Sequence, residues 1–138
     1  MGRILALDYG KKRTGIAVTD PLKIIANGLI TIETEKLFDF LKEYANKESI
    51  EKIIIGNPIN LDGSPTDATP AVHHCIRRLK NTFPAIPIIS VDERYSSKMA
   101  SNAMLEMGMK KKDRQEKGNI DLIAATMLLQ DYLGNNIL

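Results

Sequence analysis

The stretch RILALDYGKKRTGIAVT, residues 3–19, carries most of the information about the fold. Two apolar runs, Arg3–Asp8 and Thr14–Thr19, are separated by the polar turn Gly10–Arg13, a pattern that predicts a β-hairpin. A third strand-like run covers about Ala26–Ile32 after another short link. Because links this short do not allow crossover connections, we expect the three strands to form an antiparallel meander.

Downstream of the meander, helical and strand-like patterns alternate. Helical spacing predicts a helix that starts near Thr34. Ile53–Gly56 is a continuous apolar run, as in a strand that is buried on both faces. The remaining predicted elements are a helix over Ala71–Thr82, a strand over Ile88–Val91, a helix from Ser96 or Ser97 to Gly108, and a helix from a cap at Asn119 to about Leu133. We therefore predict one α/β domain over residues 1–138, in the order β-β-β-α-β-α-β-α, with a mixed five-stranded sheet and helices on both faces.

The composition fits a soluble globular protein. Of the 138 residues, 43% are hydrophobic and 26% are charged, which excludes a disordered chain. No apolar run approaches the roughly 20 residues of a membrane span. The single cysteine, Cys75, cannot form an intrachain disulfide and reads as a small core residue, so a cytoplasmic location is expected.

Acidic residues lie at the ends of three predicted core elements. Asp8 ends the first strand, Asp92 and Glu93 end the last strand, and Asp121 opens the last helix. Functional residues gather at the carboxyl ends of strands in such sheets, and burying an isolated carboxylate is costly. Small residues after Asp121, Ala124 and Ala125, would let the helix approach the sheet. We therefore expect a shared divalent cation, Mg²⁺ or Mn²⁺, and behind it phosphoryl-transfer chemistry.

Each acid also has a simpler interpretation. An aspartate after a strand is usually a turn residue, and one at a helix start is usually a cap or a partner of the helix dipole. Asp92, Glu93 and Arg94 together could form a surface salt-bridge cluster. These interpretations do not account for all three positions meeting at one predicted end of the fold.

Four motifs resemble those of the YqgF (RuvX) family of the ribonuclease H-like superfamily. They are Leu7–Gly10 with Arg13–Ala17, Ile55–Ser64, Val91–Ser97, and Lys117–Asp121 with the residues that follow it. The sequence departs from the family pattern at Asn57, Tyr95 and Ser97, none of which is an acid. The resemblance implies a ribonuclease H-like fold and a nuclease that matures the 5′ end of pre-16S ribosomal RNA. Members of the family were earlier described as Holliday junction resolvases by similarity to RuvC.

Carried over to this chain, the resemblance implies that Asp8, Glu93 and Asp121 are the catalytic, metal-binding acids. Asp92 is the substitute if Glu93 is wrong. Two metal ions would then clamp the scissile phosphate, with Asp8 as the bridging ligand. The expected nucleic-acid contacts are basic residues near the acids and in the segment 108–118: Lys12, Arg13, Arg94, Lys110, Lys111, Lys112, Arg114 and Lys117.

Three other functions stay open at this point. The chain could resolve branched DNA, which requires a homodimer, and the sequence does not decide between a monomer and a dimer. It could be a nucleotide-binding phosphotransferase of the actin, sugar kinase and Hsp70 type, because Asp8 and Gly10 before a hairpin resemble their first phosphate loop. It could also be a non-catalytic RNA-binding module, in which case the acids would be dispensable.

Overall fold

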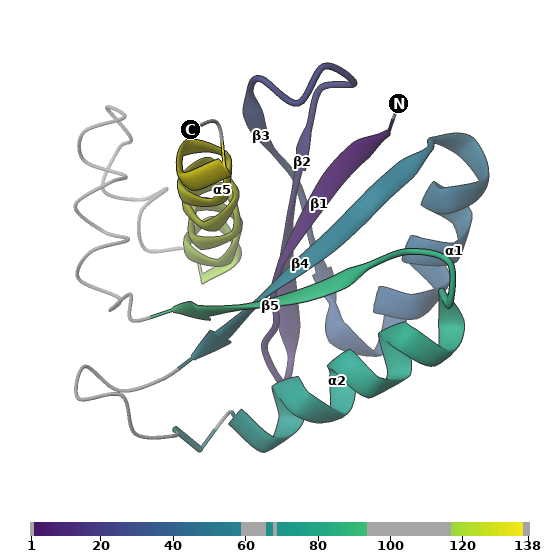
Figure 1. Ribbon diagram of the computed structural model, residues 1–138. Coiled ribbons are helices and arrows are strands. Elements are labelled where there is room, and N and C mark those ends of the chain that lie inside the picture. The colour runs from purple at the N-terminus through teal and green to yellow at the C-terminus, as the bar shows by residue number, and fades with distance from the viewer. Residues whose placement is uncertain (1, 59–65, 68, 94–116, 137–138) are drawn as a thin grey trace.

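The computed structural model describes residues 2–58, 66–67, 69–93 and 117–136, shown as coloured ribbon in Figure 1. The predicted helix from Ser96 or Ser97 to Gly108 lies outside these residues. The described elements are β1 (Arg3–Asp8), β2 (Arg13–Thr19), β3 (Ala26–Glu33), the 3₁₀ turn η1 (Thr34–Lys36), α1 (Leu37–Lys47), β4 (Ile50–Pro58), α2 (Thr69–Thr82), β5 (Ile88–Glu93) and α5 (Lys117–Asn136).

The strands form one mixed sheet in the order β3-β2-β1-β4-β5. β1 pairs antiparallel with β2, and β2 with β3, which confirms the predicted meander. β4 pairs parallel with both β1 and β5, so β1 and β5 point the same way on either side of it. The register aligns Leu7 with Ile55 and Ile55 with Ser90, so these three strands end at one edge of the sheet.

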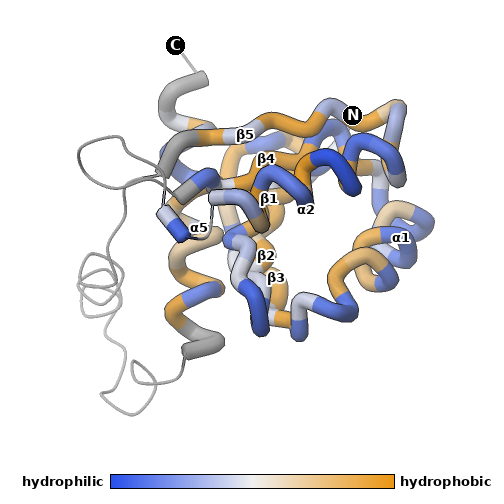
Figure 2. The backbone as a smooth tube through the Cα atoms, turned by 90° about the horizontal axis from the view of Figure 1, so that it is seen from below, coloured by the Kyte–Doolittle hydropathy of each residue, from blue (hydrophilic) through white to orange (hydrophobic). Residues whose placement is uncertain are grey.

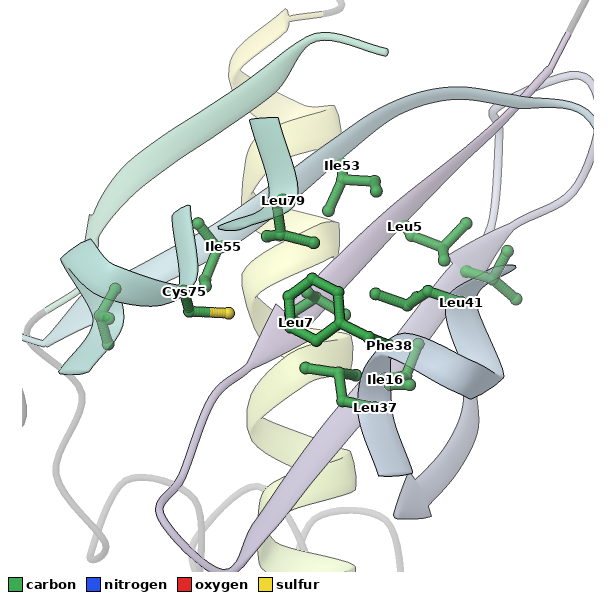
Figure 3. Packing of buried hydrophobic residues seen from close by; sticks show 12 residues of the cluster. Leu5, Leu7, Ile16, Leu37, Phe38, Leu41, Ile53, Ile55, Cys75 and Leu79 are labelled. Atoms are coloured by element: carbon green, nitrogen blue, oxygen red, sulfur yellow. The ribbon is translucent and has the colours of Figure 1, made fainter. Parts of the chain in front are cut away.

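Each face of the sheet has its own hydrophobic core. On one face, Leu5, Leu7, Ile53 and Ile55 pack with α1 and α2, as Figure 3 shows from close by. Cys75 of α2 is buried in this core, as the sequence predicted. We call it the α1/α2-side core.

On the other face, alternate residues of the same strands pack against α5. Ile4, Ala6 and Ile54 lie in one cluster with Ala125 and Leu128 of that helix. Figure 2, a view from below, shows α5 on one side of the strands and α1 on the other. We call this cluster the α5-side core, and together the two cores confirm helices on both faces.

Several elements are longer than predicted. α2 begins at Thr69 rather than Ala71, because Pro70 suits the first turn of a helix and the Thr66 N–H donates to Thr69 Oγ1 at 2.9 Å. α5 runs from Lys117 to Asn136, past the expected limits Asn119 and Leu133. No helix in the described part of the chain is long and apolar enough to span a bilayer.

Candidate active site

Asp8 ends β1 on the face that α5 covers. Side chains alternate along a strand, so even and odd positions of β1 face opposite sides of the sheet. Ile4 and Ala6 pack in the α5-side core, whereas Leu7 and Tyr9 pack in the α1/α2-side core. Asp8 therefore shares its face with Ile4 and Ala6, at the carboxyl edge where the apolar core ends.

Gly15 brings Asp121 next to Asp8. Gly15 is the β2 partner of Asp8 in the antiparallel pair. A Cβ atom at Gly15 would overlap the backbone carbonyl of Asp121, so the first turns of α5 lie directly against this strand. The sheet and the helix thus place Asp8 and Asp121 on either side of one glycine.

The role of Gly15 was not predicted from the sequence. Ala124 and Ala125 were expected to let the helix approach the sheet, and Ala125 is indeed fully buried in the α5-side core. At the level of Asp121, however, the helix can approach because Gly15 of the sheet has no side chain. A glycine within a strand often marks a close backbone approach, so Gly15 carried the signal.

Strand register separates Glu93 from Asp92. Ile89 and Val91 of β5 pack in the α5-side core, whereas Ile88 packs in the α1/α2-side core. Residue 93 therefore has the register of the α5 face, which Asp8 occupies, and residue 92 that of the opposite face. The side chains of both residues lie outside the described part of the structure.

Arg13 forms an ion pair with Asp121. Its Nε atom lies 3.5 Å from Asp121 Oδ2, and the two side chains are 38% and 26% exposed. This Nε is buried and has no hydrogen-bond partner among the described residues. The sequence predicted Arg13 as a phosphate contact, and the structure places it against one of the acids.

The turn between β1 and β2 carries three basic residues beside this ion pair, Lys11, Lys12 and Arg13, which we call the basic rim. Lys11, Lys12 and Arg13 line an open depression of about 540 Å³ together with Glu33 and Glu35. Lys11 is a further basic residue of this lining and was not among the predicted nucleic-acid contacts. The depression reaches the acids through Arg13, which both lines it and pairs with Asp121.

Thr34 ties this turn to the start of η1. Its hydroxyl donates to the Gly10 carbonyl at 2.6 Å, and its backbone N–H donates to the Lys12 carbonyl at 2.9 Å. Because the hydroxyl proton of Thr34 is used, the buried Thr14 hydroxyl donates to Thr34 Oγ1 at 2.9 Å. These three bonds fix the backbone that carries Lys11 and Lys12.

The other predicted nucleic-acid contacts are less defined. Lys117 is the first residue of α5, and only its backbone is described. The remaining five residues lie outside the described ranges: Arg94, Lys110, Lys111, Lys112 and Arg114.

The donor chemistry at this edge fits a magnesium ion. Asp8 and Asp121 supply carboxylate oxygens, the ligands that Mg²⁺ prefers, and the contact of α5 with Gly15 brings the backbones of these two residues to the same part of the sheet. Among residues 2–58, 66–67, 69–93 and 117–136, no group of three metal-ligating side chains converges. The described part therefore contains the side chains of two of the three expected ligands, Asp8 and Asp121, and only the backbone of the third, Glu93.

Comparisons with known proteins find sequence similarity along nearly the whole chain. A family model described as "RuvX: Holliday junction resolvase" matches residues 2–135. A protein of Flavobacterium johnsoniae named "Putative pre-16S rRNA nuclease" is 51% identical over 135 residues, 98% of each chain. A protein of the same name from Phocaeicola vulgatus is 50% identical over 133 residues, 96% of each chain.

Solved structures of resolvases share the fold. The structure of T. thermophilus RuvC in complex with a Holliday junction substrate superposes with a TM-score of 0.58 at 11% identity. The superposition covers 99% of this chain and 96% of that one. Fowlpox virus resolvase with Holliday junction DNA gives a TM-score of 0.60 at 11% identity, covering 99% of both chains. These structures confirm the predicted ribonuclease H-like architecture, and the family model with the half-identical relatives shows that the chain belongs to the RuvX family.

Proposed function

We propose that this chain is a metal-dependent nuclease that hydrolyses phosphodiester bonds and processes the 5′ end of pre-16S ribosomal RNA. The observation that supports the proposal is the close approach of the Asp121 backbone to Gly15, the β2 partner of Asp8, at the carboxyl edge of the sheet. The names of the half-identical relatives support the substrate.

In this proposal Asp8, Glu93 and Asp121 hold Mg²⁺ or Mn²⁺. When bound, the ion polarises the scissile phosphate and lowers the pKa of a coordinated water. The protein fixes the backbones that carry two of these acids: that of Asp8 by the β1–β2 pair, and that of Asp121 by the contact of α5 with Gly15. Glu93 is preferred to Asp92 because its register matches the face of Asp8.

The basic rim orients the substrate. Lys12 and Arg13 line the depression beside the acids, where they would contact phosphates of the nucleic acid on either side of the scissile bond. The chain carries five basic residues between positions 108 and 118, and these would contact further phosphates along the nucleic-acid strand. Affinity should therefore fall as salt concentration rises. A cytoplasmic location, to which the single cysteine points, belongs to the same proposal.

Cleavage of two substrates tests the proposal. Purified protein is incubated with a pre-16S RNA fragment that spans the mature 5′ end, and separately with a four-way DNA junction, each with Mg²⁺ or with EDTA. We expect Mg²⁺-dependent cleavage of the RNA, and no cleavage in EDTA. Cleavage that persists unchanged in EDTA would contradict the metal-dependent mechanism.

Resolution of branched DNA is the second candidate, favoured by the description of the matching family model. It requires two active sites, and hence a dimer, to cut two strands symmetrically. Symmetric cleavage of the junction by a dimer in solution, without cleavage of the RNA, would favour this activity over ribosomal RNA processing.

A further inference from the structure

The Arg13–Asp121 ion pair occupies one of the acids that the proposed function assigns to the metal. A guanidinium 3.5 Å from Asp121 Oδ2 neutralises one carboxylate of a site that gathers at least two. A divalent cation at Asp121 would meet that positive charge at close range, and like charges in contact repel. Arg13 and the metal are therefore competitors for Asp121.

The guanidinium is held loosely enough to leave. Both partners are partly exposed, at 38% and 26%, and exposed ion pairs contribute little to stability. The Nε atom of Arg13 is buried without a hydrogen-bond partner among the described residues, so no directed bond from that atom keeps it beside Asp121. Movement of the side chain away from Asp121 therefore breaks this ion pair but no hydrogen bond from Nε.

The same side chain borders the depression on the basic rim. Arg13 lines it beside Lys11 and Lys12, whose backbone is fixed by the bonds to Thr34. A guanidinium that leaves Asp121 has this space next to it, where a phosphate would form a charge-assisted, bidentate contact. The side chain of Arg13 can thus contact Asp121 first and, once displaced, a phosphate of the substrate.

We propose that Arg13 is a positioning residue that exchanges partners: it neutralises Asp121 before metal binds, and the incoming metal displaces it toward a substrate phosphate. The inference rests on the proposed function, because it assumes that Asp121 is a ligand. It couples metal binding to substrate binding, since each event favours the same displaced position of Arg13.

Binding of Mn²⁺ alone, measured by calorimetry without nucleic acid, tests the exchange. We expect Arg13→Gln to bind Mn²⁺ about two- to five-fold more tightly than the wild type, the factor that corresponds to losing a partly exposed competing ion pair. Lys12→Gln removes the same charge from the same turn without touching Asp121, and should change the affinity less. Equal or weaker Mn²⁺ binding by Arg13→Gln would overturn the exchange.

A double-variant comparison separates competition at Asp121 from the general field of a positive charge. In an Asp121→Asn background, adding Arg13→Gln should leave the Mn²⁺ affinity unchanged. A gain of the same size in both backgrounds would contradict the inference. If Asp8→Asn and Asp121→Asn each bind Mn²⁺ as tightly as the wild type does, the proposed metal site itself is wrong, whatever the effect of Arg13→Gln.

The substrate half of the exchange has its own readout. Arg13→Gln should raise KM for the nucleic acid, and Arg13→Lys should restore part of that loss because a lysine retains the charge but not the bidentate geometry. An unchanged KM in Arg13→Gln would exclude a phosphate contact.

Discussion

At the scale of single residues, the site depends on which face of the sheet each acid occupies. Asp8 follows Ile4 and Ala6 onto the face of α5, while Tyr9 packs in the α1/α2-side core. A shift of one residue along β5 separates Glu93 from Asp92 in the same way. The two-residue period of the strands therefore determines which of these acids share a face of the sheet.

Gly15→Ala tests the close approach of α5. The new methyl group would overlap the Asp121 carbonyl, which belongs to the backbone and cannot move without the helix. We expect a loss of about 1–3 kcal/mol in the free energy of unfolding, as for other overpacked sites, measured by urea denaturation. Weaker Mn²⁺ binding should accompany it, because Asp121 is displaced.

Gly134→Ala is the matched control. Nothing lies within 4 Å of a Cβ atom at Gly134, which is part of the same helix. Here alanine should stabilise the protein by up to about 1 kcal/mol through its helix propensity. Equal effects of the two substitutions would show that the contact at Gly15 does not constrain the helix.

At the scale of elements, the turn between β1 and β2 is fixed by Thr34 before any substrate arrives. Thr34→Val keeps the shape of the side chain but removes its hydroxyl, and with it the bonds to the Gly10 carbonyl and the Thr14 hydroxyl. We expect stability to fall by about 1–3 kcal/mol and affinity for nucleic acid to weaken, since Lys11 and Lys12 lose a fixed backbone. Fluorescence anisotropy with labelled RNA measures the affinity.

Thr34→Ser is the control for this substitution. Serine keeps the hydroxyl and should retain most of the RNA affinity. If valine and serine bind RNA equally well, the hydrogen bonds of Thr34 do not prepare the turn for binding.

The hairpin between β2 and β3 is expected to lose stability in acid. Asp20 accepts the backbone N–H groups of Ile25 and Ile24, each at 2.8 Å, and that of Leu22 at 3.2 Å. The bond from Ile25 is the main reason that the pKa of Asp20 lies below its usual value of 3.8. A lowered pKa in the folded state stabilises the protein above the unfolded value, and this stabilisation disappears as pH falls through the folded value.

Asp20→Asn should therefore flatten the acid limb of the stability curve. Asparagine keeps an acceptor oxygen but does not titrate, so its free energy of unfolding should fall less than that of the wild type as pH drops below 3.8, the usual pKa of an aspartate. Urea denaturation at a series of acidic pH values gives both curves. Parallel curves would contradict the assignment.

At the scale of the whole molecule, the sequence predicted the order of the described elements and the parallel direction of the first and last strands, whose carboxyl ends share one edge of the sheet. Short continuous apolar runs were sufficient because the central strands are buried on both faces: β1 and β2 are buried at consecutive positions, and Ile53–Ile55 are fully buried in the middle of the sheet. The pairing of Arg13 with Asp121 could not be read from the sequence, because it depends on where α5 crosses β2. The contact at Gly15 depends on the same crossing, which local patterns do not determine.

The element limits were also hard to predict. The start of α2 at Thr69 depends on a hydrogen bond with Thr66, three residues earlier in a segment rich in loop-forming residues. The longer β4 depends on its pairing with β1 and β5, since Glu51 and Lys52 have no strand-like hydrophobic pattern of their own. The first limit is decided by a local side-chain hydrogen bond, and the second by tertiary strand pairing.

The central claim is that the acids on the α5 face of the sheet carry Mg²⁺-dependent cleavage. The most direct measurement is the rate of cleavage of the pre-16S RNA fragment by wild type, Asp8→Asn, Glu93→Gln, Asp121→Asn and Asp92→Asn, each checked for folding by circular dichroism. We predict that the first three substitutions abolish cleavage and that Asp92→Asn, on the opposite face by register, retains most of it. Full activity in Asp8→Asn, or an active Glu93→Gln beside an inactive Asp92→Asn, would contradict the account.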